Sequence, residues 1–374
     1  MSVRDVIVVG AGPSGLATAI AAKTHGLDYL VLEKGVLVNS IFHFPPQMVF
    51  FTTPELLEIG GLPFVSSYNK PTRAEALTYY RKVVDRYDLQ IAFDEQVLGV
   101  ARDDAEQAFE VETRSSKGVR RVRLARHVIF AIGYYDHPVR LDILGEDLPH
   151  VHHYYAEPHR HYRQRVIVVG GGNSSAEAAL ELYRCGAHVT LVHRHPALKR
   201  TIKYWVRPDI ENRIKEGSIA ARFNSCVIEI RPTSVLVQAI PDAAATADDE
   251  AARARELAAD ADASHAPAAT VIAPAAGRGA GTIVEELAAD AVYLLTGYRA
   301  DSELLCRAGI RLNERDAPMF DKETFETNVP GLFVAGGAIA GKDTGTVFIE
   351  NGRFHGERIV KVLSERRRGL VAAR

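Results

Sequence analysis

The N-terminal residues pass from an apolar run directly into a glycine-rich turn. Four β-branched residues at positions 6–9 are followed by GAGPSG at 10–15 and by the small apolar segment LATAIAA at 16–22. A short apolar run bounded by glycine is typical of a buried parallel strand, and the segment after the turn has helical composition. The pattern predicts a strand, a tight turn and a helix, and the apolar run at 29–32 predicts the next strand of a βαβ unit.

This unit recurs along the chain, at an offset of 160 residues from Gly10 to Gly170. Residues 166–169 are again β-branched, and GGGNSSAEA follows at 170–178. Strands that alternate with helices in this way build parallel sheets. We therefore predict an α/β fold with two Rossmann-like dinucleotide-binding domains. The second domain is inserted in the first, and the expected segments are 1–150, 151–290 and 291–374.

The remaining segments carry weaker patterns. A helical period begins near Thr72, and alternating residues around a turn at Lys117-Gly118 predict a small antiparallel layer in the first domain. The aromatic segment 41–54 has no period and is expected to be an ordered loop, packed by its own side chains or covering a flavin. The alanine-rich stretch at about 241–281 is expected to be a solvated insertion without a catalytic role. The strands expected in the antiparallel layer are 90–100, 109–113 and 119–124, and a separate buried strand is expected at 128–132.

The three glycines of the first motif have separate roles. The first permits the tight turn, the second lets the backbone approach a pyrophosphate, and the third allows the helix to pack closely on the strand. The free N–H groups of the helix N-terminus then face the phosphates. Glu33 follows the second strand at the spacing of an acid that binds a ribose hydroxyl. The predicted FAD contacts here are Gly10, Gly12, Pro13, Ser14, Gly15, Glu33 and Lys34.

The second motif differs where the ribose is recognised. The position of the acid falls on His193, next to Arg194, and the third glycine is replaced by the small Ser175. A carboxylate would repel a 2'-phosphate, whereas a guanidinium can pair with one, with charge added by His193, Lys199 or Arg200. The second site is therefore expected to bind NADPH, the alternative being a solvated strand end. The predicted contacts are Gly170, Gly172, Asn173, Ser174, Ser175, His193, Arg194 and Lys199.

Further apolar strands also end on glycine, and these glycines are expected to contact cofactor. A helix is expected to open at Thr344–Thr346 with its N-terminus against the flavin. In many FAD proteins an Asp follows the last of these glycines, and here Gly337 leaves the ribityl contact unassigned. Substrate is expected near residues 152–155 and the loop 42–51. The additional predicted cofactor contacts are Gly133, Gly297, Gly336 and Thr346.

Composition and charge narrow the class of protein. A net charge of −2 gives no reason to expect nucleic acid or an anionic membrane as partner. No apolar run approaches the ~20 residues of a membrane span and no signal peptide precedes the first strand, so a cytoplasmic location is expected. Cys185, Cys226 and Cys306 are far apart, without CxxC or metal-ligand spacing. We expect buried or inert thiols, no redox-active pair and no metal.

Six longer segments outside the glycine motifs also resemble a known family. They are FFTTPELLEIGGLPF, NKPTRAEALTYYR, FAIGYYDHP, LPHVHHYYAEPH, KYWVRPDIENRIKEG and TVFIENGRFHGER. With both motifs, nearly the whole chain resembles the two-dinucleotide-binding flavoproteins, and these segments resemble the bacillithiol disulfide reductases. The resemblance implies that NADPH reduces FAD and that the flavin's electrons reopen the disulfide of oxidised bacillithiol, a glucosamine-malate-cysteine thiol. A homo-oligomer, dimer or tetramer, is also expected.

One departure from the family bears on catalysis. Relatives often carry Cys, proposed to act in catalysis, where this chain has Ser14. The candidate catalytic groups are therefore the flavin itself, Ser14, His152 and His153. A thioredoxin reductase is excluded, because residues 151–165 before the second motif contain no CxxC. A flavin monooxygenase and a non-turnover NADPH-sensing flavoprotein remain as alternatives.

Overall fold

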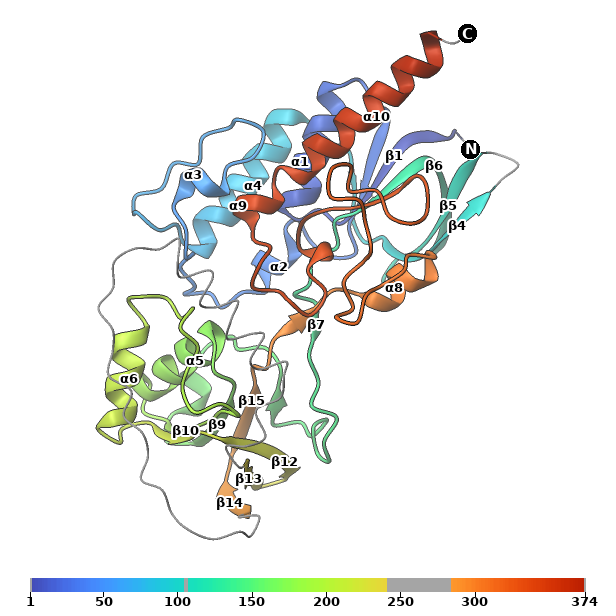
Figure 1. The fold of residues 1–374 in the computed structure, drawn as a ribbon. Helices are drawn as coiled ribbons and strands as arrows, with labels where there is room; N and C mark the ends of the chain where they lie inside the picture. The colour runs from blue at the N-terminus through green and yellow to red at the C-terminus, as the bar shows by residue number, and fades with distance from the viewer. Residues whose placement is uncertain (1, 104–106, 241–283, 373–374) are drawn as a thin grey trace. The chain divides into compact units, whose positions relative to one another are not determined.

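The computed structural model describes residues 2–103, 107–240 and 284–372. The chain divides into two compact units, Met1–Val139 with Gly297–Arg374 (unit 1) and Arg140–Thr296 (unit 2) (Figure 1). Each unit contains a sheet built around parallel strands and has its own core, so the predicted α/β fold with two Rossmann-like parts is confirmed. The alanine-rich segment at 241–281 lies outside the described residues.

The sheet of unit 1 has seven strands. Its order is β3-β2-β1-β6-β5-β4, with β17 also paired with β6. The first glycine turn joins β1 to helix α1, as the apolar pattern predicts. The strands are β1 (Arg4–Val9), β2 (Tyr29–Leu32), β3 (Ile91–Ala92), β4 (Gln96–Asp103), β5 (Ala108–Arg114), β6 (Arg120–Phe130) and β17 (Leu332–Val334).

Strand β6 corrects one prediction. The segments 119–124 and 128–132, expected as two strands, form one continuous strand that ends at Phe130. Its first half pairs antiparallel with β5, and its second half pairs in parallel with β1 and β17. Strands β4 and β5 therefore form the predicted antiparallel layer while remaining hydrogen-bonded to the parallel sheet.

Both faces of the unit 1 sheet are buried. In β1, the apolar side chains at positions 6–9 point alternately to the two faces. Val6 and Val8 belong to a core shared with α1, α4 and α10, whereas Ile7 and Val9 belong to a core shared with β4, β5 and α8. Helix α10 runs beside α1 (Figure 1). The helices are α1 (Pro13–Thr24), α2 (Asn39–Phe42), α3 (Pro54–Leu57), α4 (Arg73–Tyr87), α8 (Ser302–Arg307), α9 (Ile349–Gly352) and α10 (His355–Ala372), with a 3-10 turn at Gly336–Ile339.

Local capping explains where two of these helices begin. Thr72 caps α4 through a reciprocal capping box with Glu75, as the predicted helix start requires. The C-terminal helix does not open at Thr344–Thr346 as expected. The side chain of Asn351 instead holds the segment before α9 in a non-helical conformation. It accepts a hydrogen bond from Phe348 N and donates one to Thr346 O. The helical part therefore starts at Ile349.

Unit 2 repeats the alternation of unit 1. Its five-stranded sheet has the order β11-β10-β9-β15-β8, and all its pairings are parallel. Val166 and Val168 pack with α5 and α6, while Ile167 and Val169 pack against the antiparallel sheet β12-β13-β14. The elements are β8 (Val151–His152), β9 (Arg165–Val169), α5 (Asn173–Arg184), β10 (His188–Val192), α6 (Arg207–Lys215), β11 (Ala220–Arg222), β12 (Ser225–Arg231), β13 (Ser234–Ala239), β14 (Val284–Ala288) and β15 (Ala291–Leu294), with a 3-10 turn at His159–His161.

A two-stranded ribbon completes unit 1. Strand β7 (His137–Pro138) pairs antiparallel with β16 (Tyr298–Arg299). Of the helices that the structure describes, none is long and apolar enough to span a membrane.

Candidate cofactor sites

The first glycine turn has the geometry its sequence predicts. A Cβ atom added to Gly10 would lie 2.5 Å from the Ala131 carbonyl oxygen, and one added to Gly15 would lie 1.9 Å from the Gly10 carbonyl oxygen. Both positions therefore require glycine. At Gly12 no atom lies within 4 Å of the added Cβ, so this backbone faces open space. Pro13 is the first residue of the 12-residue helix α1, whose N-terminus suits an anionic phosphate.

Glu33 is held beside this turn. One carboxylate oxygen accepts the Ala11 N–H and the other accepts the Gly35 N–H, both at 2.8 Å. The residue is 5% exposed, and burial raises the pKa of the carboxyl group despite the two backbone hydrogen bonds. Each oxygen retains a lone pair, so the fixed carboxylate can still accept from a ribose hydroxyl.

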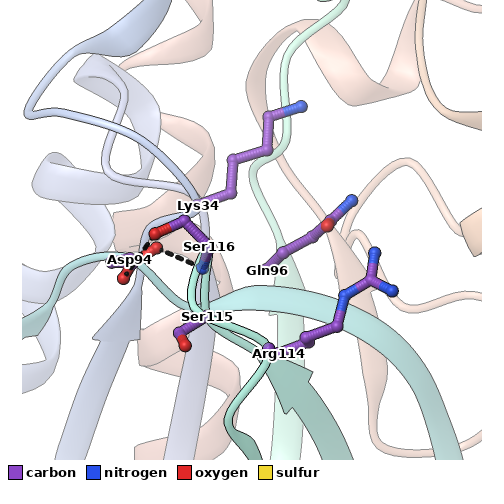
Figure 2. Close-up of a pocket in the computed structure, with 7 residues that line it drawn as sticks. Lys34, Asp94, Gln96, Arg114, Ser115 and Ser116 are labelled. Atoms are coloured by element: carbon purple, nitrogen blue, oxygen red, sulfur yellow. Dashed lines mark hydrogen bonds between the residues drawn. The ribbon is translucent and has the colours of Figure 1, made fainter.

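A polar pocket adjoins Glu33 at the end of β2. Figure 2 shows its wall, in which Asp94 accepts from both the backbone N–H and the hydroxyl of Ser116. Gln96 and Arg114 are paired residues on β4 and β5. The Lys34 ammonium forms a 2.9 Å ion pair with Asp136. The sequence around Lys34 does not predict this partner, which lies about 100 residues further along the chain. The labelled lining residues are Lys34, Asp94, Gln96, Arg114, Ser115 and Ser116.

The end of β17 packs against the start of α1. A Cβ atom on Gly336 would lie 2.3 Å from Ser14 Oγ, so the serine side chain fits only against a glycine. The Gly336 N–H donates to Nδ1 of His355, 3.1 Å away, and the His355 ring stacks on Phe325. Burial lowers the pKa of His355 to about 4, which keeps this acceptor neutral. Sequence patterns gave no signal for His355.

The second glycine turn is built differently. Gly170 has φ of +143°, and a Cβ atom on it would lie 3.1 Å from the Ser175 Cβ, which explains why a small residue suffices at 175. Ser175 is fully buried, and its hydroxyl donates to the Gly172 carbonyl. Near Gly172 the added Cβ meets only a Lys199 methylene, at 3.9 Å. This turn is therefore also open to a ligand, at the N-terminus of α5.

The side chain of Asn173 hydrogen-bonds to the loop at 201–203, next to this turn. Its side chain accepts from Lys203 N at 2.8 Å and donates to Thr201 O at 3.1 Å. The Lys199 N–H donates to the Gly171 carbonyl at 2.9 Å. These bonds bring the backbone after β10 to the glycine turn. Ser174, Arg194 and Lys199, all predicted contacts, are exposed in this part of unit 2.

His193 corrects one expectation. Its side chain is 6% exposed, and burial lowers its pKa to about 3, so it supplies no positive charge for a phosphate. A Cβ atom on Gly171 would lie 2.2 Å from both Cε1 and Nε2 of the ring. The imidazole therefore occupies the space that a side chain at 171 would need. The middle glycine of GGG, in contrast to Ala11 of GAG, was the sequence signal for this packing.

Of the residues expected near substrate, 152–155 belong to unit 2 and the loop 42–51 belongs to unit 1. Tyr155 is buried, and its hydroxyl donates to Glu181 at 2.8 Å, so its side chain is part of the core. The His152 ring lies 5.1 Å from that of Tyr293. His153 Nε2 lies 3.5 Å from a Glu146 oxygen. Burial lowers the pKa of both histidines, which makes them neutral hydrogen-bonding groups and not cations at neutral pH.

The remaining predicted contacts are backbone positions and one hydroxyl. Gly133 and Gly297 have φ of +66° and +110°, and added Cβ atoms would meet nothing within 4 Å. The Thr346 hydroxyl donates to the Asp343 carbonyl within its own turn. Cys185, Cys226 and Cys306 are all free; the first two are partly buried and Cys306 is exposed.

Comparison with known proteins assigns the family. A family described as pyridine nucleotide-disulphide oxidoreductase matches residues 7–252 and 278–336. Bacilliredoxin reductase Bdr of Bacillus subtilis is 36% identical over 364 residues, which cover 97% of this chain and 98% of the relative.

Two solved structures agree with this assignment. The bacillithiol disulfide reductase Bdr (YpdA) from Bacillus cereus has a TM-score of 0.83 and 34% identity, covering 98% of this chain and 100% of that structure. The Staphylococcus aureus protein of the same name has a TM-score of 0.82 and 33% identity, covering 98% and 99%. This chain is therefore an FAD- and NADPH-dependent oxidoreductase that belongs to the pyridine nucleotide-disulphide oxidoreductases and, among them, to the family of the bacillithiol disulfide reductases.

Proposed function

We propose that unit 1 binds FAD, that unit 2 binds NADPH, and that the enzyme reduces the disulfide of bacillithiol. The observation that carries the cofactor assignment is the contrast after the second strand of each unit. Unit 1 holds the carboxylate of Glu33 beside its turn. Unit 2 has a neutral His193 at the matching position, followed by the exposed Arg194. A 2'-phosphate is compatible only with the second arrangement.

The FAD contacts follow from the geometry of unit 1. The turn at 10–15 would bind the pyrophosphate at the N-terminus of α1, and Glu33 would accept from the adenosine ribose. The adjoining pocket, with Lys34, Gln96 and Arg114, would take the adenine end. Gly133, Gly336 and Thr346 would line the other half of the cofactor.

The NADPH contacts follow in the same way. The pyrophosphate would lie against Gly170, Gly172 and the exposed Ser174 at the start of α5. Arg194 and Lys199 would pair with the 2'-phosphate, an interaction in which a guanidinium is favoured by its planar donors. Ser175 and Asn173 would shape the turn and its neighbouring loop.

Bound FAD supplies a two-electron relay between a nicotinamide and a disulfide. The overall reaction consumes one NADPH, one proton and one disulfide, and it yields one NADP⁺ and two thiols. The names of the relatives from Bacillus cereus and Staphylococcus aureus support bacillithiol disulfide as the oxidant. We place the substrate near His152, His153 and Tyr154, which would act as uncharged hydrogen-bonding groups.

Turnover with defined stoichiometry tests this function. The purified yellow enzyme should oxidise NADPH on addition of bacillithiol disulfide and release two thiols for each NADPH. Oxygen-dependent NADPH oxidation with a long-lived oxygen adduct would favour a monooxygenase instead. Flavin that NADPH reduces but that transfers electrons to no disulfide would favour a sensing role.

A second acceptor is suggested by the name of the Bacillus subtilis relative, a bacilliredoxin reductase. Here the disulfide would involve a small thiol-carrier protein. Rates measured with bacillithiol disulfide alone and with added bacilliredoxin separate the two substrates. A rate that depends entirely on bacilliredoxin would assign the protein acceptor.

We further propose direct electron transfer to substrate, without an internal dithiol. The three cysteines are free, and none lies within a CxxC motif. A variant with Cys185→Ser, Cys226→Ser and Cys306→Ser should retain turnover with full FAD content. Lost turnover in a folded, flavin-loaded variant would instead identify a catalytic thiol. Ser14 stays a candidate contact near the flavin.

For assembly and location we propose a cytoplasmic homo-oligomer, a dimer or tetramer. Free cysteines suit a reducing compartment. Large exposed apolar side chains on unit 1, such as Val65 at 87% and Phe51 at 54% exposure, suit burial against another copy. Light scattering on the purified enzyme would measure the number of chains.

A further inference from the structure

One aromatic side chain at the carboxyl edge of the unit 1 sheet has no role in the assignment above. Tyr134 follows β6, and its ring lies against Gly337, two residues beyond the buried Ala335 that follows β17. A Cβ atom on Gly337 would lie 2.7 Å from Tyr134 Cδ1 and 3.0 Å from Cε1. These atoms belong to a rigid ring close to its backbone. Tyr134 therefore occupies the space that a side chain at 337 would take.

Strand order places this ring on one side of the phosphate turn. Strand β1 lies between β2 and β6, and β17 pairs with β6. Glu33 follows β2, and the glycine turn follows β1. A dinucleotide that has its ribose at Glu33 and its pyrophosphate at the turn must continue toward the ends of β6 and β17. Tyr134 and Gly337 lie at those ends.

The Tyr134 hydroxyl is available to a ligand. Within the described residues it has no hydrogen-bond partner, although the side chain is only partly exposed. Burial, with a smaller contribution from Glu350, raises its pKa, so the phenol is a neutral donor at physiological pH. The hydroxyl oxygen is not among the fully buried polar atoms that lack a partner, so water can reach it and a ligand acceptor can replace that water.

We propose that Tyr134 binds the flavin-bearing half of FAD. Its ring replaces the missing side chain at 337, and its hydroxyl donates a hydrogen bond to an oxygen or nitrogen acceptor of the cofactor. The inference rests on the proposed FAD site of unit 1. The proposal explains why residue 337 is a glycine: the Tyr134 ring occupies the space of its side chain within the FAD site.

The conservative variant Tyr134→Phe separates the hydroxyl from the ring. The ring keeps its contact with Gly337, so folding should be unchanged. Loss of one hydrogen bond should speed FAD release from the diluted holoenzyme by about threefold to tenfold. The absorption maximum of the bound flavin should also shift. Tyr68→Phe, at a 69% exposed tyrosine of the same unit, is the matched control and should behave as wild type.

A second pair of variants tests the shared space. Gly337→Ala should speed FAD release more than Tyr134→Phe, because its methyl group displaces the ring. The double variant Tyr134→Ala with Gly337→Ala should release FAD more slowly than predicted by adding the effects of Tyr134→Ala and Gly337→Ala, each measured alone. Additive effects would overturn the steric part of the proposal.

The outcomes are distinguishable from failure of the proposed function. Wild-type protein that binds no FAD would contradict the cofactor assignment itself. Wild-type protein that binds FAD, with a Tyr134→Phe variant identical in release rate and spectrum, would overturn only the role of Tyr134. If Gly337→Ala does not fold, the comparison of Tyr134→Phe with Tyr68→Phe still tests whether the Tyr134 hydroxyl binds FAD.

Discussion

Units 1 and 2 repeat the same strand, turn and helix, yet the residue after their second strand acts in different ways. Glu33 accepts the N–H of Ala11, the middle residue of the first turn. His193 instead packs its ring where a side chain at Gly171 would be. The imidazole therefore requires glycine at 171, whereas Glu33 needs only the backbone N–H at position 11. We propose that discrimination between the two cofactors depends on this packing as well as on the charged residue.

The third position of the motif differs as well. A methyl group at Gly15 would meet the Gly10 carbonyl at 1.9 Å, whereas Ser175 fits against Gly170. The helix of unit 1 thus approaches its strand more closely than a side chain permits. The two turns share a sequence pattern but tolerate different substitutions, and variants at matched positions measure that difference.

The largest effect is expected at Gly15. In Gly15→Ala the new methyl group meets backbone, so the turn must open at a cost of about 3 kcal/mol or more. The purified variant should contain much less FAD, measured by flavin absorbance for each protein chain. Ser175→Ala is the matched change in unit 2 and should leave FAD content and the KM for NADPH within about threefold. Equal tolerance at both positions would show that the turns do not differ.

The steric change Gly171→Ala is expected to weaken NADPH binding without affecting FAD binding. Gly171→Ala brings a methyl group onto the buried His193 ring, at a cost of about 2–3 kcal/mol. The KM for NADPH should rise by more than tenfold with FAD content unchanged. Adding His193→Ala should restore part of the affinity, because it removes the ring. A double variant no better than Gly171→Ala would refute this role of the packing.

Acid should weaken the fold through His193. Its folded pKa is about 3, below the ordinary 6.5, so the unfolded chain binds the proton more readily between these values. Stability therefore rises with pH from about 3 to 6.5, and at pH 5 the unfavourable contribution is about 2 kcal/mol. Chemical denaturation at pH 7 and pH 5 should show a smaller difference for His193→Gln than for wild type. His127 and His355, with pKa values of about 4, remain in both proteins and serve as a common background.

The smallest effect is expected for Glu33→Gln. The Ala11 and Gly35 N–H groups bond different carboxylate oxygens, so when one oxygen is replaced by an amide NH2 group, one of these donors loses its acceptor. The unmatched donor should cost about 1–2 kcal/mol, which corresponds to roughly tenfold faster FAD release. The KM for NADPH should stay unchanged. Glu55→Gln, at an exposed carboxylate of unit 1, is the control.

Sequence patterns predicted the fold well where structure is set locally. The βαβ units at the two glycine motifs and the start of α4 depend on apolar runs, glycines and a capping box, all of which are short-range. The continuous strand β6 was divided wrongly, because its two halves pair with different neighbours far apart in the chain. The start of α9 was misplaced because Asn351 binds the preceding backbone.

Side chains that act through tertiary contacts were harder to predict. The charge expected of His193 was wrong because burial, invisible in sequence, keeps the ring neutral. The roles of His355 and Tyr134 depend on backbone positions about 20 and 200 residues away along the chain. Glycine motifs gave the location of the cofactor turns, but not the residues that pack against them.

The central claim, that unit 2 and not unit 1 recognises the 2'-phosphate, is tested most directly by binding of 2',5'-ADP to the holoenzyme. Lys34 and Arg194 occupy matched positions after the second strand of each unit, at the offset of 160 residues from Gly10 to Gly170. Isothermal titration should show that Arg194→Ala weakens binding by about tenfold or more, since a charge-assisted hydrogen bond is lost. Lys34→Ala should leave the affinity unchanged. The reverse pattern, or equal losses in both variants, would contradict the account.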